Sequence, residues 1–372
     1  MKPDLSRQLA LDALVRVDEE AAYANLLLPS MLRRSQLRER DRAFATELVY
    51  GTVRMRRACD WLVDRFVQRD LDVRTRNLLR MGAYQLQFLG TPVYAVVSTS
   101  VELGGRARKL AEAVLRRVAD REPEWPDDAT RLSYPDWIVG RLVEDLGREP
   151  AMAALETMNK APTVHERPDG YVQDLASQWT GAYVGAAEGE RIADLCAAPG
   201  GKSTFMAEAG AFVAAGDMRP NRAALVRDNA RRVGAPGVAT FVGDARRPPL
   251  RVADRVLVDA PCSGLGVLRR RPDARWRVKP EAVDTLATLQ RQLLGAAGDL
   301  VRPGGRLVYS VCTLTNAETL AIDEWLAGER PDLVAEPPPG EPWRPMGRGA
   351  RLLPQNADTD GMYVLGLRRK GG

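Results

Sequence analysis

The sequence predicts a multidomain chain: an N-terminal all-α part, then a C-terminal α/β part of the Rossmann-like class with a mostly parallel sheet. Three observations support this. Apolar residues between positions 5 and 120 recur every three or four residues, the period of an α-helix. A Pro- and acid-rich stretch at 122–128 has the composition of a domain linker. From about residue 170, short apolar runs alternate with helical stretches, which favours a parallel sheet buried on both faces.

The helical part should contain five or more helices. Periodic apolar positions run through three of its stretches, 5–17, 44–53 and 78–89. Thr91-Pro92 breaks the pattern, and residues 93–101 are β-branched but have flanks that favour a helix. The chain of 372 residues is long enough for several cores. We therefore expect three parts, a helical domain at 1–125, a helical linker at 126–170 and an α/β domain at 171–372.

Each element of the α/β part follows from an apolar run bounded by turn residues, or from helical spacing. The predicted strands lie at 191–195, 212–216, 238–242, 254–259, 306–312 and 362–367. The predicted helices lie at 202–209, 219–233, 281–300 and 316–327. In an open α/β sheet of this kind, ligands bind at the carboxyl ends of the strands.

Composition restricts the function classes. The hydrophobic content of 45% and the absence of a long apolar run lead us to expect a cytoplasmic protein without membrane association. The net charge of +5 suggests a polyanionic partner. The four cysteines form no CxxC pair, so we expect neither a metal site nor a disulfide framework. The single histidine, His165, has no nucleophile nearby in sequence, so acid–base chemistry should fall to carboxylates, lysine or cysteine.

A Gly-rich turn between a predicted strand and a helix is a candidate cofactor site. It comprises Cys196, Ala197, Ala198, Pro199, Gly200, Gly201 and Lys202. Glycines let the backbone approach a ligand closely. Four successive strands end near an acid, namely Asp194, Asp217, Asp244 and Asp259. The alternative, that these acids only cap helices, is less favoured for four in succession. Because the turn lacks GxGxxG, it suits an adenosyl cofactor better than a pyrophosphate.

Two cysteines stand where chemistry is expected. Cys262 and Cys312 each lie at the end of a predicted strand, so one thiol could attack a substrate while the other assists. The alternative for either is a buried and inert thiol, the commonest fate of free cysteine. Cys196 should pack near the cofactor, and Cys59 should lie in the helical core.

Three segments resemble the Sun/Fmu (RsmB-type) RNA cytosine-5 methyltransferases, namely Asp194–Thr204, Asp259–Trp276 and Tyr309–Glu318. Residues 1–120 resemble the NusB-like RNA-binding domain that bacterial members carry in front. The resemblance implies S-adenosylmethionine as the cofactor. The residues that would bind it are Cys196, Ala197, Ala198, Pro199, Gly200, Gly201, Lys202, Asp217, Arg222, Asp244 and Asp259.

The resemblance also implies roles around the base. Cys312 would add to C6 of cytosine as the nucleophile, and Cys262 would assist breakdown of the adduct and release of RNA. Asp259 would hydrogen-bond the base, and Lys202 would place a charge between base and cofactor. A base inside a duplex cannot present C6 to a thiol, so the target should be single-stranded or flipped.

The expected partner is ribosomal RNA, methylated at a cytosine of the small subunit by a monomeric enzyme. A transfer-RNA cytosine is an alternative, as is a NusB-like RNA-binding factor with an inactive methyltransferase domain. A basic cluster would bind the RNA through Arg269, Arg270, Arg271, Arg275 and Trp276, unless it is only a solvated loop. Three features depart from the family pattern, one of them the stretch 104–109, which is short against the NusB-like pattern. Val311 stands where a threonine is more usual, and the segment before Val172 is too short for the usual small subdomain.

Overall fold

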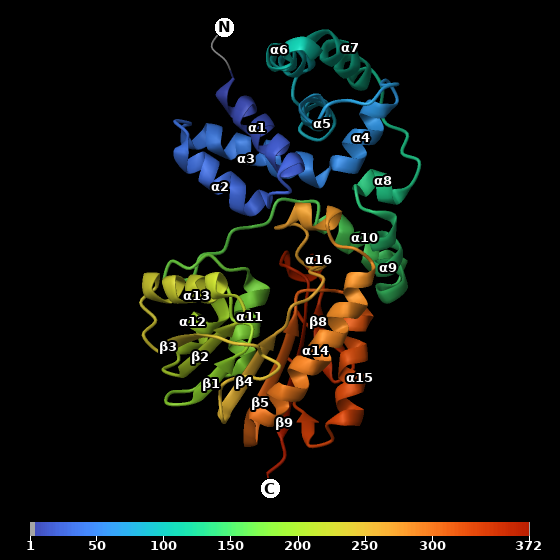
Figure 1. The fold of residues 1–372 in the computed structure, drawn as a ribbon. Helices are drawn as coiled ribbons and strands as arrows, with labels where there is room; N and C mark the ends of the chain where they lie inside the picture. The colour runs from blue at the N-terminus through green and yellow to red at the C-terminus, as the bar shows by residue number, and fades with distance from the viewer. Residues whose placement is uncertain (1–3, 372) are drawn as a thin grey trace. The chain divides into compact units, whose positions relative to one another are not determined.

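The computed structural model describes residues 4–371 and divides into two compact units (Figure 1). The helical unit comprises the chain up to Val139 together with a later segment, Leu268–Arg277, which we call the return segment. The α/β unit comprises Gly140–Val267 and the chain from Val278 onward. Within residues 4–371, no helix has both the length and the apolar character needed to cross a membrane.

The helical unit confirms the all-α prediction for the first part of the chain. Its helices are α1 (Leu5–Glu19), α2 (Ala24–Arg34), α3 (Glu39–Arg54), α4 (Arg56–Asp64), α5 (Val73–Gln87), α6 (Val93–Leu103), α7 (Arg108–Ala119) and α8 (Asp128–Leu132), with the 3-10 turns η1 (Gly105–Ala107) and η2 (Pro272–Trp276). The β-branched stretch is helical, as its flanks indicated. Asp4 and Asp72 cap α1 and α5, because their side chains accept hydrogen bonds from Arg7 N and Thr75 N.

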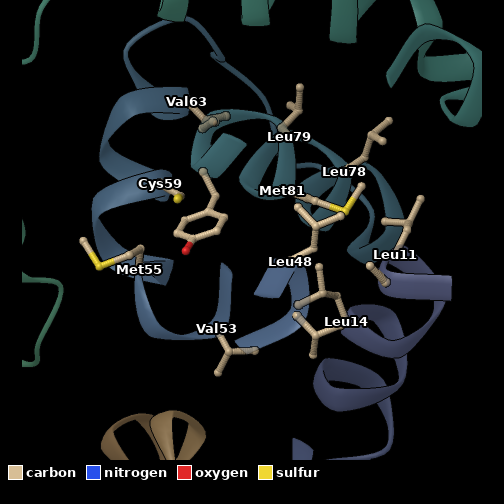
Figure 2. Packing of buried hydrophobic residues seen from close by; sticks show 14 of the residues in the cluster. Leu11, Leu14, Leu48, Val53, Met55, Cys59, Val63, Leu78, Leu79 and Met81 are labelled. Carbon is tan, nitrogen blue, oxygen red and sulfur yellow. The ribbon is translucent and has the colours of Figure 1, made fainter. Parts of the chain in front are cut away.

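The core of the helical unit is largely apolar, and a buried ionic group lies at its edge. Side chains of α1, α3, α4 and α5 pack together in it, among them Leu11, Leu48, Cys59 and Met81 (Figure 2). Arg80 of α5 lies at the edge of this core with its side chain 8% exposed. It donates hydrogen bonds to Asp18 at 2.8 Å and to Asp60 at 2.7 and 2.8 Å. These two carboxylates compensate the buried charge and link α5 to α1 and α4.

The helical unit extends past the predicted boundary at residue 125. The Arg57 side chain donates to Thr130 Oγ1 at 3.1 Å and to the Tyr134 carbonyl at 2.8 Å. These bonds attach α8 and the turn after it to α4. The unit therefore includes the start of the segment that the sequence suggested as a linker.

The return segment, which sequence reasoning placed with the α/β domain, packs into the helical unit. The Trp276 indole N–H donates to the Val53 carbonyl at 2.7 Å. The Arg275 guanidinium stacks 3.8 Å above the centroid of the Tyr134 ring and donates to the Ser133 carbonyl at 3.1 Å. Both contacts bury part of the arginine-rich return segment. From its charge pattern alone, this segment would be expected to lie exposed to solvent.

Two of the predicted RNA-binding arginines are therefore corrected. Arg269 is 1% exposed and Arg275 is not exposed at all. Their side chains are buried within the protein, so they cannot bind phosphates at its surface. Arg271 is exposed, and Arg270 and Trp276 are half-buried. For these three residues RNA binding stays a prediction.

The α/β unit confirms the Rossmann-like prediction. Within the described residues, its nine strands form one sheet in the order β3-β2-β1-β4-β5-β9-β8-β7, with β6 paired to β9. The strands are β1 (Arg191–Asp194), β2 (Phe212–Asp217), β3 (Val238–Val242), β4 (Ala253–Asp259), β5 (Val301–Val311), β6 (Leu333–Ala335), β7 (Arg344–Met346), β8 (Gly349–Leu352) and β9 (Met362–Arg369). Strands β1 to β5 pair in parallel, and β9 runs antiparallel to β5.

Helices cover both faces of this sheet (Figure 1). The helices are α10 (Arg148–Thr157), α11 (Leu175–Val184), α12 (Gly201–Ala207), α13 (Pro220–Arg232), α14 (Glu281–Leu300), α15 (Leu320–Glu329) and α16 (Pro354–Ala357), with the 3-10 turn η3 (Asn316–Glu318); α9 (Asp136–Leu146) begins in the helical unit and ends in this one. Alternate residues of β4 face opposite layers. Val256 and Val258 pack with α14 and α15, while Leu257 packs with α11, α12 and α13.

Replacing Arg275 with alanine should destabilise the helical unit by about 2 to 4 kcal/mol, because it removes a buried cation–π contact and leaves the Ser133 carbonyl without this donor. Urea unfolding followed by circular dichroism would measure the change. Arg271→Ala, four residues earlier and exposed, is the matched control and should unfold like the parent. Equal midpoints for all three proteins would contradict the structural role of Arg275.

Candidate active site

The loop after β1 is held in a fixed shape by its own backbone. Ala197 N donates to the Gly216 carbonyl at 2.8 Å, and Gly200 N donates to the Ala197 carbonyl at 2.7 Å. Gly200 has a φ of +102°, and a Cβ there would come within 3.1 Å of Val226. Only glycine meets both requirements. Residues Cys196 to Gly200 therefore form a tight loop at the carboxyl end of β1, and Gly201 and Lys202 open α12.

The predicted strand-end acids have different partners. Asp194 is buried and accepts a hydrogen bond from Ser203 Oγ at 2.6 Å. Burial raises its pKa to about 7, although the Ser203 bond opposes that shift. Asp217, at the end of β2, accepts from Arg222 Nε at 2.9 Å, and Arg222 also donates to the Ala198 carbonyl at 3.0 Å. Arg222 thus connects the loop after β1 to the neighbouring strand.

The other two acids lie on either side of this pair. Asp244, just past β3, is paired with Arg246 at 2.7 Å. Asp259 ends β4 and accepts hydrogen bonds from Lys202 Nζ at 2.7 Å and from Ser310 Oγ at 2.6 Å. Burial alone would lower the pKa of Lys202, but Asp259 outweighs it and the pKa is raised. Lys202 is therefore a cation held at the strand ends.

The two thiols that sequence reasoning singled out meet at the same edge of the sheet. Cys262 follows β4, Cys312 follows β5, and their Sγ atoms lie 3.3 Å apart. The hydrogen bond to Cys312, together with burial, raises the pKa of Cys262. Lys202 interacts electrostatically with Cys312. The raised pKa favours the protonated form of Cys262, and either sulfur can donate in the contact between them.

Glu318 connects the two cysteine loops, and sequence reasoning assigned it no role. Its buried carboxyl group accepts hydrogen bonds from Ser263 N at 2.8 Å, Ser263 Oγ at 2.5 Å and Thr313 Oγ1 at 3.2 Å. Thr315 Oγ1 and Gln290 Nε2 donate to it at 2.8 and 3.1 Å. Ser263 follows Cys262 and Thr313 follows Cys312, so one carboxyl group fixes the backbone beside both thiols.

The structure therefore brings together the four residues predicted to be catalytic: Lys202, Asp259, Cys262 and Cys312. Ser310 and Glu318 were missed as members of this site. A signal for Ser310 exists in hindsight, because it occupies the position of β5 that pairs with Asp259. Cys196 is half-buried, and removal from water raises the pKa of its thiol, so it stays protonated.

Comparison with known proteins finds relatives of both parts of the chain. The model of the 16S rRNA methyltransferase RsmB/F family matches residues 183–368, and the NusB family model matches residues 4–120. Ribosomal RNA small subunit methyltransferase B of Thermus thermophilus is 36% identical, with 99% of each chain covered. The protein of that name from Salmonella newport is 30% identical, with 98% of each chain covered. These alignments run over 403 and 433 positions, so both relatives carry residues without a counterpart here.

Solved structures share the fold. The crystal structure of the protein PH0851 matches with a TM-score of 0.82 at 22% identity over 99% of each chain. A methyltransferase homolog from Pyrococcus horikoshii matches with a TM-score of 0.56 at 22% identity, over 67% of this chain and all of that one. The sequence relatives and the two family models together identify the chain as a member of the 16S rRNA methyltransferase RsmB/F family with a NusB-family helical domain at its front.

Proposed function

We propose that this protein transfers a methyl group from S-adenosylmethionine to C5 of a cytosine in small-subunit (16S) ribosomal RNA, through a covalent bond between Cys312 and C6 of the base. One observation carries the proposal. Two thiols lie 3.3 Å apart beside a Lys202–Asp259 ion pair, at the carboxyl ends of adjacent parallel strands. A methyltransferase acting on a heteroatom needs no thiol nucleophile, whereas C5 of cytosine is too weakly nucleophilic to react without one.

The residues at the strand ends fit the proposed cofactor. Asp217 and Asp244 offer carboxyl oxygens to ribose hydroxyls or a base edge, and the loop from Cys196 to Gly200 offers backbone groups. One buried oxygen of Asp194, Oδ1, has no hydrogen-bond partner among the described residues. When bound, S-adenosylmethionine supplies an electrophilic methyl group. Arg222 would keep the loop and Asp217 in register for it.

The residues around the base have separate proposed roles in the addition to C6, the orientation of the base and the release of the product. The Cys312 thiolate adds to C6, which makes C5 nucleophilic, and Lys202 stabilises negative charge on that sulfur. Asp259, oriented by Lys202 and Ser310, hydrogen-bonds the base. After methylation, the C5 proton passes to the solvent, the electron pair of that C–H bond re-forms the C5–C6 double bond, and the C6–sulfur bond breaks with its electrons on Cys312, which restores the aromatic ring. Cys262, the thiol beside Cys312, assists this last step.

Bisulfite sequencing of total RNA from cells with and without the gene tests the proposal. We expect one cytosine of 16S ribosomal RNA to lose protection when the gene is deleted. A lost position in transfer RNA instead would favour the alternative substrate. Unchanged RNA, together with no S-adenosylmethionine binding by calorimetry, would favour an RNA-binding factor without catalysis.

The two thiols should fail in different ways. Cys312→Ala should abolish both methyl transfer and the RNA adduct, because no sulfur remains to attack C6. Cys262→Ala should form the adduct but release it slowly, so a protein–RNA band should accumulate on a denaturing gel. Cys59→Ala, in the core of the helical unit, is the control for loss of a thiol. The opposite pattern, with the adduct trapped by Cys312→Ala, would exchange the two assignments.

Glu318→Gln should slow adduct formation by up to about 100-fold, because the amide loses acceptor capacity and the two cysteine loops shift apart. Affinity for S-adenosylmethionine, measured by calorimetry, should stay unchanged since Glu318 is not among the residues proposed to bind it. Glu324→Gln, on the exposed side of α15, is the matched control. Normal adduct formation in Glu318→Gln would show that the thiols do not depend on this network.

A further inference from the structure

A cavity of about 450 Å³ lies within the helical unit, apart from the thiols and strand ends. Helices α1, α3, α4 and α5 and the return segment all contribute to its lining, and every lining residue belongs to the helical unit. The volume is in the range of ~300 to 1,000 Å³ typical of small-ligand sites. Its walls carry four arginines and two aspartates, namely Arg56, Arg76, Arg80, Arg277, Asp18 and Asp273. The lining therefore has excess positive charge.

Three of these arginines are already committed to partners. Arg80 is hydrogen-bonded to two aspartates, and Arg76 is hydrogen-bonded to Asp64. Arg277 donates to the carbonyl of Ala21 at 2.7 Å and to that of Ala22. Within residues 4–371 these bonds hold the three guanidinium groups in the wall of the cavity, so they are less available to a ligand.

Arg56 differs from them. Its closest carboxylate is Asp18, with the Nη1–Oδ1 distance at 3.5 Å, and its side chain is 39% exposed. It makes no hydrogen bond through its guanidinium to the described part of the chain. Burial, and then the positive charge of Arg80, lower the pKa of Arg56. An anion in the cavity would relieve this repulsion and accept the free donors.

Two further side chains of the cavity wall, an aromatic ring and a hydroxyl group, could contact a ligand. Trp276 lines the cavity, and the Arg56 guanidinium lies 5.9 Å from the centroid of its ring. The bond from the indole N–H to the Val53 carbonyl fixes that ring in place. Thr52 also lines the cavity and is 1% exposed, yet its hydroxyl has no hydrogen-bond partner among the described residues. A buried unpartnered hydroxyl of this kind is costly unless a ligand or water pairs with it.

We propose that this cavity binds one nucleotide of a single-stranded RNA segment, with its phosphate on Arg56, its base against Trp276 and a polar group on Thr52. A cation next to an aromatic face is the combination that binds nucleotides of single strands. The inference rests on the proposed RNA substrate. It gives the return segment a function, since Trp276 comes from that segment and completes the site in the helical unit.

The test measures affinity of the full chain for a fluorescently labelled single-stranded RNA oligonucleotide by anisotropy, at several salt concentrations. Arg56→Gln should weaken binding about tenfold and reduce the slope of log affinity against log salt by about one, as for one lost phosphate contact. The matched control, Arg117→Gln, removes an exposed arginine of α7 outside the cavity. Its slope of log affinity against log salt should differ from that of the parent by less than about one half.

Thr52→Val separates ligand binding from folding. It should weaken RNA binding several-fold but leave the thermal midpoint unchanged or higher, because it removes a buried unpartnered hydroxyl without changing side-chain size. A lower midpoint with unchanged affinity would contradict the inference.

Three other outcomes would overturn it. If Arg56→Gln and Arg117→Gln bind RNA equally well, the cavity does not hold the strand, although the proposed function stands. The assay is repeated with free cytidine monophosphate as a competitor for the cavity. If Arg56→Gln keeps its RNA affinity but this competitor no longer affects it, the occupant is a free nucleotide. Absence of RNA binding by the parent chain would instead refute the proposed function together with this inference.

Discussion

The parallel pairing of β4 with β5 is the constraint on which the rest of the candidate active site depends. The register aligns Asp259 with Ser310, and Ala260 N donates to the Ser310 carbonyl at 2.9 Å. Both strands therefore end at the same level of the sheet, and the loops that follow them bring Cys262 and Cys312 to a separation of 3.3 Å. A shift of the register by one residue would turn Asp259 to the opposite face, away from Lys202. The backbone hydrogen bonds of the sheet thus set the positions of these side chains.

A second layer of polar contacts keeps the loops in place once the strands have ended. Loops beyond a sheet lose the ladder bonds, so their backbone must be held by other groups. The Glu318 carboxyl group does this for both loops, and Tyr309 of β5 donates its hydroxyl to the Glu318 carbonyl at 2.7 Å. Because these donors come from β5, α14 and the two loops, the network forms only when the whole edge is folded. Burying such a group is costly without partners, and here the fold supplies them.

Sequence patterns predicted the features of the fold that depend on residues close together in the chain. Strands of four or more residues between helices gave the parallel sheet, and the residues at strand ends gave Asp259 and both thiols. Strands β6 to β8 were missed because they are short and lie in a Pro- and Gly-rich stretch whose turn residues interrupt any apolar run. Ser310 and Glu318 could not be assigned roles, since their partners are fixed by strand register and by loops distant in sequence. Arg275 was misjudged because Tyr134 and the Ser133 carbonyl, which compensate its burial, are brought to it only by the fold.

The two thiols acquire different properties from their neighbours and not from residue type. Both are cysteines that follow parallel strands, so position along the chain alone gives no reason to prefer one as the nucleophile. The hydrogen bond to Cys312, then burial, and then the charges of Cys312 and Glu318 raise the pKa of Cys262. The charge of Lys202 interacts with Cys312. The raised pKa of Cys262 means that this thiol holds its proton more firmly than a free cysteine does. The proposed role of Cys312 as the nucleophile rests instead on the cation beside it, because the charge of Lys202 stabilises the thiolate that adds to the base.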